Sequence, residues 1–143
     1  MNQITLGKQA TRDAIQKLEG AMLDQGDLTT DFDEYLTHYF GEGTYVREMR
    51  LPVDTVIVGK IHKYEEVCVL TKGIILVRAD GASESNVYEA PYVFNAAPGK
   101  KVLYILEDAI FLNILPNPNN LRDIDALERE LILPEYPALE VVS

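Results

Sequence analysis

Short β-rich segments separated by turn residues are the feature that most constrains the fold of this chain. Between Tyr45 and Leu115, runs rich in Val, Ile, Leu and Tyr alternate with positions held by Pro, Gly, Asn and Asp. About seven strands at this spacing indicate an antiparallel sandwich or barrel. The expected strands are 45–51, 55–59, 66–71, 73–78, 87–89, 92–95, 101–106 and 109–115. The pattern therefore predicts a mainly β protein, with Lys72-Gly73 and Glu107-Asp108 as turns.

Helical patterns lie on both sides of these strands. Thr11 can cap a helix that carries apolar residues at helical spacing, and a second short helix is expected over residues 31–40 before a glycine break. Asn120 is expected to cap a last helix with an apolar stripe. The predicted organisation is an N-terminal helical segment packed on the barrel (1–43), the jelly roll (44–117), and a C-terminal helix and tail (118–143).

Composition limits the partners. The chain has 143 residues, which suits one domain of the usual ~100–200 residues, and its 23 acidic and 13 basic residues give a net charge of −10. This charge repels phosphate backbones and anionic membranes, so nucleic-acid and membrane partners are not expected. A single cysteine, Cys68, fits a reducing compartment, and neither a spanning apolar run nor a signal pattern is visible. A soluble, cytoplasmic protein is predicted.

The stretch from Leu51 to Gly73 is where a pocket is expected. If this stretch is extended, His62, Tyr64 and Glu66 share parity with the preceding apolar strand and project from one face. A few polar groups on an otherwise apolar strand are how a barrel lines a ligand pocket. The sequence therefore places a candidate site on this segment.

The chain resembles the small cupin-like proteins encoded in tailed-phage genomes. The similar segments are YVREMRLPVDTVIVGKIH, LTKG and YEAPYVFNAAPGKKVLYILEDAIFLNILPNP, preceded by LTHYF (Leu36 to Phe40). The resemblance extends over about residues 35–132 and implies a cupin-type antiparallel jelly roll, often dimerised through strand edges. It also implies the cytoplasm of the host cell as the location, with the virion as an alternative.

The same resemblance bears on metal binding. Metal-binding cupins carry two histidines and a carboxylate in a first motif and a third histidine after a Pro-x-Gly-type turn. His62 and Glu66 can occupy two of these places, whereas Lys60, Tyr64 and Lys101 stand at the others. No cofactor is predicted. If a divalent metal binds, His62 and Glu66 are its ligands, because His38 is read as lying outside the barrel strands.

A set of polar residues can orient a small ligand inside the barrel. Inward positions on facing strands of a barrel meet across its interior. The candidate ligand-binding residues are His62, Tyr64, Glu66, Lys101, Arg47 and Asn113. Two alternatives remain open at this point. Glu66 and Lys101 can form a self-satisfied buried ion pair, and Arg47 can be an edge-strand charge that discourages aggregation.

Three functions fit these residues. The first is a non-catalytic binding module that holds a small polar or anionic molecule. The second is a cupin enzyme, either metal-dependent or acting on sugar nucleotides, with His62 as general base and Tyr64 as general acid. The third is a structural or virion-associated assembly protein. A homo-oligomer, a dimer or larger, is expected under all three because open sheet edges need cover.

Overall fold

The computed structural model describes residues 33–79 and 84–133. The helix expected after Thr11 and the apolar tail after Leu133 lie outside the described residues. The elements follow the order η1 (Asp33–Tyr35), β1 (Leu36–Gly41), β2 (Thr44–Leu51), β3 (Val56–Val58), β4 (Ile61–His62), β5 (Glu66–Ala79), β6 (Asn86–Glu89), β7 (Tyr92–Ala96), β8 (Lys101–Pro116), α2 (Ile124–Leu131) and β9 (Ile132–Leu133). The prediction of a mainly β chain with a C-terminal helix is confirmed.

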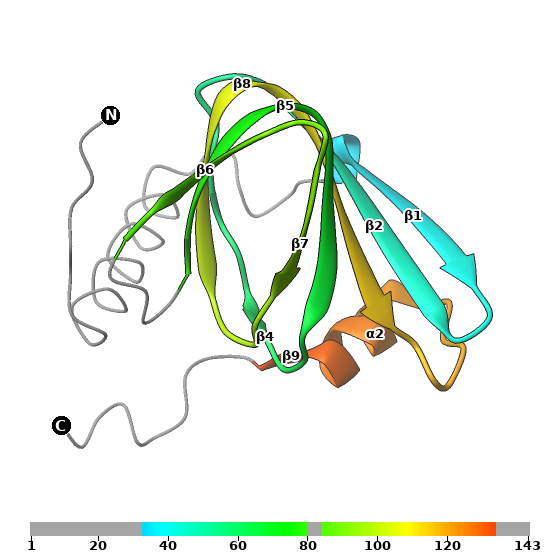
Figure 1. Cartoon of the computed structure of the whole chain (residues 1–143). Helices are drawn as coiled ribbons and strands as arrows, with labels where there is room; N and C mark the ends of the chain where they lie inside the picture. Colours follow the sequence, from blue (N-terminus) through cyan, green and yellow to red (C-terminus); the bar gives the residue numbers. More distant parts are fainter. Residues whose placement is uncertain (1–32, 80–83, 134–143) are drawn as a thin grey trace, which may run out of the picture.

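The strands form a curved antiparallel barrel built around β5 and β8 (Figure 1). The main sheet has the order β1-β2-β8-β5-β6, with β3 also paired to β8 and β7 also paired to β5. Strands β5 and β8 pair with each other along most of their lengths, and each also pairs with two other strands. These two strands therefore form the centre of the main sheet. A second, two-stranded sheet joins β4 to β9 at one end of the barrel.

The two turns predicted inside the sheet are bends within long strands. Strand β5 runs unbroken through Lys72-Gly73, and β8 runs unbroken through Glu107-Asp108. The register of the β5–β8 ladder shifts between Leu70 and Ile75, which marks a bulge. Gly73 has a φ of 90°, and a Cβ there would overlap the Asp108 carbonyl oxygen. The glycine therefore permits two bent strands to approach closely, and the turn prediction was wrong.

The helix predicted over residues 31–40 is wrong for its second half. Among the described residues from 33 onward, η1 is helical and Leu36–Gly41 is a strand paired with β2. The glycines read as a helix break form the β1–β2 hairpin turn, in which Gly43 has a φ of 70°. The main sheet therefore begins before residue 44. Because β1 covers β2, Arg47 is not on an edge strand, and the edge-charge alternative falls.

Two separate apolar clusters stabilise the fold. The barrel core lies between the sheet faces and includes Leu70, Ile75 and Ile105, which are fully buried. The second cluster joins α2 to the outer end of β2 and β8, mainly through Leu127 and Leu131. The predicted apolar stripe of this helix is thus confirmed.

The N-cap of α2 differs from the prediction. The side chain of Asp123, not Asn120, accepts a hydrogen bond from the Asp125 backbone N–H at 3.0 Å. Asn120 instead adopts a positive φ and accepts a hydrogen bond from the Gly43 N–H at 2.7 Å. This contact ties the β1–β2 hairpin to the loop before α2. Within residues 33–79 and 84–133, no helix has the length and apolar character needed to cross a membrane.

Candidate ligand-binding site

The segment expected to present one continuous polar face is interrupted. After β4 ends at His62, the chain bends at Lys63 and Tyr64 before β5 begins at Glu66. The bend turns Tyr64 outward, where 47% of it is exposed, while His62 and Glu66 are buried. In β3 it is Ile57 that is buried, so the common parity predicted from Val56 onward was wrong. Tyr64 lines neither cavity described below.

His62 and Glu66 form a buried pair. The His62 Nδ1 and Glu66 Oε2 atoms are 3.2 Å apart, and both side chains are more than nine-tenths buried. Neither atom has a well-aligned hydrogen-bond partner among the described residues. Burial by itself raises the pKa of Glu66, but the contact with His62 and the charges of Lys101 and Arg47 outweigh it and lower the pKa below 4.5. Glu66 is therefore ionised at neutral pH.

A chain of hydrogen bonds connects this pair to Arg47. The Asn113 side chain donates from Nδ2 to Glu66 Oε1 at 3.2 Å, and its Oδ1 accepts from Arg47 Nη2 at 3.0 Å. Strands β2, β5 and β8 position the three residues, since Arg47 and Cys68 both pair with Asn113 in the sheet. The buried Nε of Arg47 has no hydrogen-bond partner in the described part of the chain. One guanidinium N–H thus stays available to a bound molecule.

Lys101 lines the same cavity of the barrel as Glu66 but forms no ion pair with it. Its Nζ donates to the Ala97 carbonyl oxygen at 3.0 Å, whereas the carboxylate of Glu66 faces His62. The alternative in which Glu66 and Lys101 form a buried ion pair is therefore wrong, because the partner of Glu66 is His62. The positive charge of Lys101 still contributes to the lowered pKa of Glu66, which places it within electrostatic range.

Cys68 is a buried neighbour of this network. Its Sγ lies 3.6 Å from Glu66 Oε1 and 3.5 Å from Asn113 Nδ2. Burial and the Glu66 charge raise the pKa of the thiol to about 12, so it is not a nucleophile at neutral pH. Cys68 therefore packs as a small buried side chain.

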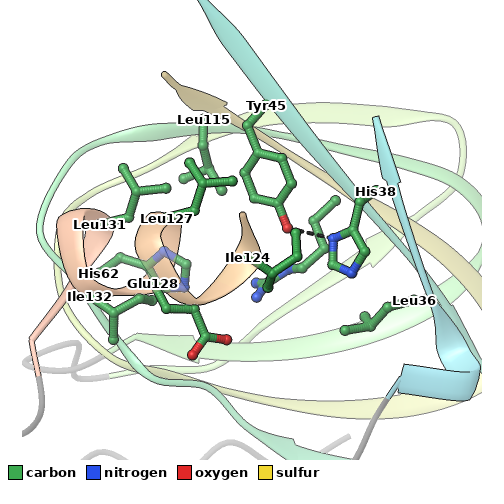
Figure 2. Close-up of a pocket in the computed structure, with 11 residues that line it drawn as sticks. Leu36, His38, Tyr45, His62, Leu115, Ile124, Leu127, Glu128, Leu131 and Ile132 are labelled. Carbon is green, nitrogen blue, oxygen red and sulfur yellow. Dashed lines mark hydrogen bonds between the residues drawn. The ribbon is translucent and has the colours of Figure 1, made fainter. Parts of the chain in front are cut away.

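Two small cavities have Arg47 and His62 among the residues that line both of them. The barrel cavity, of about 50 Å³, lies between the sheet faces and is also lined by Glu66, Lys101 and Asn113. The helix cavity, of about 60 Å³, lies between α2 and strands β1 and β2 (Figure 2). Five of the six predicted site residues thus line the barrel cavity, and Tyr64 does not.

Sequence reasoning missed the far side of the helix cavity. His38 and Tyr45 lie there, with His38 Nδ1 and the Tyr45 hydroxyl oxygen 2.6 Å apart (Figure 2). Burial is the main cause of a raised pKa for Tyr45, which therefore keeps its proton. Tyr45 alternates along β2 with Arg47 and Met49, which line the cavities. His38 was missed because a helix was predicted over residues 31–40.

The described residues include no group of three His, Cys, Asp or Glu side chains placed to hold a metal ion. His62 and Glu66 contact each other, while His38 is engaged with Tyr45 across the helix cavity. The donor set therefore does not match the three protein ligands typical of a catalytic zinc site.

A solved structure with the same fold supports the architecture. KdgF from Halomonas sp. superposes with a TM-score of 0.50 at 14% identity, covering 71% of this chain and 94% of KdgF. The fold is that of the cupins. A cupin-2 domain protein from Shewanella frigidimarina (TM-score 0.47, 9% identity, 67% and 92% coverage) and a cupin-like protein from Thermotoga maritima (0.49, 11%, 58% and 67%) are also similar. At such identities the likeness extends to the fold alone.

No family model matches the sequence, and no curated protein matches it at a significant level. The assignment of the cupin fold rests on the strand topology and the structural similarity, and the properties of the site follow from the residues of this chain.

Proposed function

We propose that this cupin-fold protein is a binding module that holds a small anionic molecule inside the barrel without transforming it. The observation that carries the proposal is Arg47, a guanidinium on an inward face whose buried Nε has no hydrogen-bond partner in the described part of the chain. A buried donor left unpaired costs about 1–3 kcal/mol, which a bound acceptor would recover. An anion is the natural acceptor for arginine.

The charges around the barrel cavity support the same choice. Arg47 and Lys101 supply two positive charges, and Glu66 supplies one negative charge that His62 already contacts. The local balance is thus positive in a protein whose net charge is −10. Clefts with one sign of charge and apolar walls concentrate the opposite ion.

The test is binding of acetate and inorganic phosphate, followed by NMR chemical shifts of the backbone amides. We expect saturable shifts in β2, β5 and β8 that disappear in Arg47→Met, a substitution that keeps the bulk of the side chain. Arg50→Met is the matched control, because Arg50 is exposed on the opposite face of the same strand. Equal binding by wild type and Arg47→Met, or no binding of either anion, would contradict the proposal.

A second candidate is proton-transfer catalysis in the helix cavity. His62 carries a carboxylate partner, as a general base does, and Tyr45 lines the same cavity as a protonated hydroxyl, the role first assigned to Tyr64. Cavities of about 50 and 60 Å³ favour small carbonyl compounds over sugar nucleotides. Solvent-deuterium exchange into pyruvate, followed by NMR, tests this candidate. Exchange that is lost in His62→Ala and Tyr45→Phe supports it, and no exchange above buffer refutes it.

Self-association remains a proposal, and the phage setting remains a prediction. Strand β1 lies at one edge of the main sheet with Tyr39 exposed on it, so a second copy could pair there. Native mass spectrometry of the full chain would report a dimer or larger assembly. A monomer at micromolar concentration would exclude it.

A further inference from the structure

We propose that the bound anion is a short aliphatic carboxylate, with its head in the barrel cavity and its tail in the helix cavity. This inference rests on the proposed function and adds the ligand class. It starts from the fact that Arg47 and His62 line both cavities, so that one molecule can contact them while extending to either side.

The barrel cavity suits the charged head. Lys101 and Asn113 line it together with Arg47, and all three carry N–H donors. The helix cavity is lined by one acidic residue, Glu128, whose Oε2 atom forms an ion pair with Lys60 Nζ at 3.1 Å. A carboxylate head placed beside Glu128 would face a like charge, whereas in the barrel cavity it faces two cations and one already engaged carboxylate.

The helix cavity suits a hydrocarbon tail. Apart from Arg47 and His62, which also line the barrel cavity, its polar members have partners, since His38 and Tyr45 bond to each other and Glu128 pairs with Lys60. Its other walls are aliphatic, and Figure 2 shows several of them facing one another across the space. These side chains are Leu36, Leu115, Ile124, Leu127, Leu131 and Ile132. A tail here replaces empty space without leaving a polar group unpaired.

The cavity volumes limit the length of the tail. An engineered apolar cavity of about 150 Å³ holds benzene, and the helix cavity has about 60 Å³. Room of this size accepts about two or three carbons beyond the carboxylate carbon. We therefore expect propionate and butyrate to fit and hexanoate to be too long.

The experiment measures dissociation constants of acetate, propionate, butyrate and hexanoate with the full chain by NMR titration. Each added methylene up to butyrate should tighten binding by about fourfold, the factor expected for burying one CH₂ group. Hexanoate should bind more weakly than butyrate. Butyrate that binds no more tightly than acetate would overturn the inference.

Two variants locate the tail. Ile124→Phe fills the helix cavity from a half-buried position, so it should abolish the gain from acetate to butyrate. Val93→Phe, on an exposed outer position, is the control and should keep the gain. A gain that persists in Ile124→Phe would refute the proposed position of the tail.

If Ile124→Phe does not fold, Leu127→Ala enlarges the same cavity and should move the tightest binding to a longer chain. An unchanged optimum would count against the inference. Failure of the inference and of the proposed function are distinguishable. Acetate binding that needs Arg47 but shows no chain-length gain removes only the tail, whereas no binding of any carboxylate or of inorganic phosphate removes both.

Discussion

The barrel lines one cavity by itself and shares the helix cavity with the α2–β9 segment, and these two regions contain very different amounts of structure. On the barrel side, β5 and β8 are strands of 14 and 16 residues that pair with each other and with several neighbours. On the other side stand a helix of eight residues and a two-residue strand, held by a separate small apolar cluster. The polar residues of the proposed anion site therefore lie mainly on the extensively paired strands, whereas most of the aliphatic lining of the helix cavity comes from α2 and β9.

This difference predicts that destabilising substitutions in the barrel unfold the whole domain, whereas those in the α2–β9 segment unfold that segment alone. Strand β9 does reach the site, because Ile132 pairs with His62. Loss of this segment should thus expose His62 without unfolding β5 and β8. The following variants test the contrast, from the largest expected effect to the smallest.

Gly73→Ala should destabilise the whole barrel. A methyl group there would overlap the Asp108 carbonyl oxygen and lie 2.7 Å from the Ala109 Cα, on a residue with a φ of 90°. We expect a loss of about 3 kcal/mol or more in the free energy of unfolding by urea. Gly43→Ala is the control, since Gly43 also has a positive φ but has open space around it. It should cost only about 1 kcal/mol, and equal losses would show that the close approach is unimportant.

Glu66→Gln should lower stability in a pH-dependent way. The folded-state pKa of Glu66 lies below 4.5, so the ionised carboxylate stabilises the fold above that pH and the contribution is lost as pH falls through the folded pKa. We expect wild type to exceed Glu66→Gln by about 2 kcal/mol at pH 7, as for a buried charge-assisted contact. Urea titrations at pH 7, 5 and 3 should show this difference shrinking with acidification. A difference that grows at low pH would contradict the assignment.

Asp123→Ala should loosen α2 alone. Its side chain accepts a hydrogen bond from the Asp125 N–H, and loss of an N-cap costs about 1 kcal/mol. Amide hydrogen exchange should accelerate in α2 and β9 and remain unchanged in β5 and β8. Asp125→Ala, within the helix, provides a comparison that leaves the capping side chain in place. Equal acceleration throughout the barrel would show that the two regions unfold as one unit.

Lys60→Met should have the smallest effect. Lys60 and Glu128 form an ion pair at 3.1 Å between the barrel and α2, but both side chains are substantially exposed. Such pairs contribute about 0.5 kcal/mol or less and weaken with salt. Thermal unfolding at low and high salt should differ little from wild type. A loss above 1 kcal/mol would mean that this contact, and not the apolar cluster, holds α2 in place.

Much of the site was predictable from period-two alternation. Arg47 shares parity with Tyr45 and Met49, and all three face inward on β2. His62, Glu66, Lys101 and Asn113 also line the predicted interior. The prediction for Tyr64 was wrong because a bend of the chain between β4 and β5 changes which face its side chain occupies. Alternation along the sequence gives the face of a side chain only while the strand continues.

The resemblance to cupin-like proteins implied the cupin type of barrel. The residues by themselves determined that this chain is mainly β and that its strands form an antiparallel sandwich or barrel. Alternation and turn residues are local signals, so these features can be read from neighbours along the chain. Only the tertiary structure decided that Lys72-Gly73 and Glu107-Asp108 are bends, that Leu36–Gly41 is a strand, and that α2 forms a wall of the site. Each of these depends on pairing between residues far apart in sequence, whose free energy outweighs the local preference.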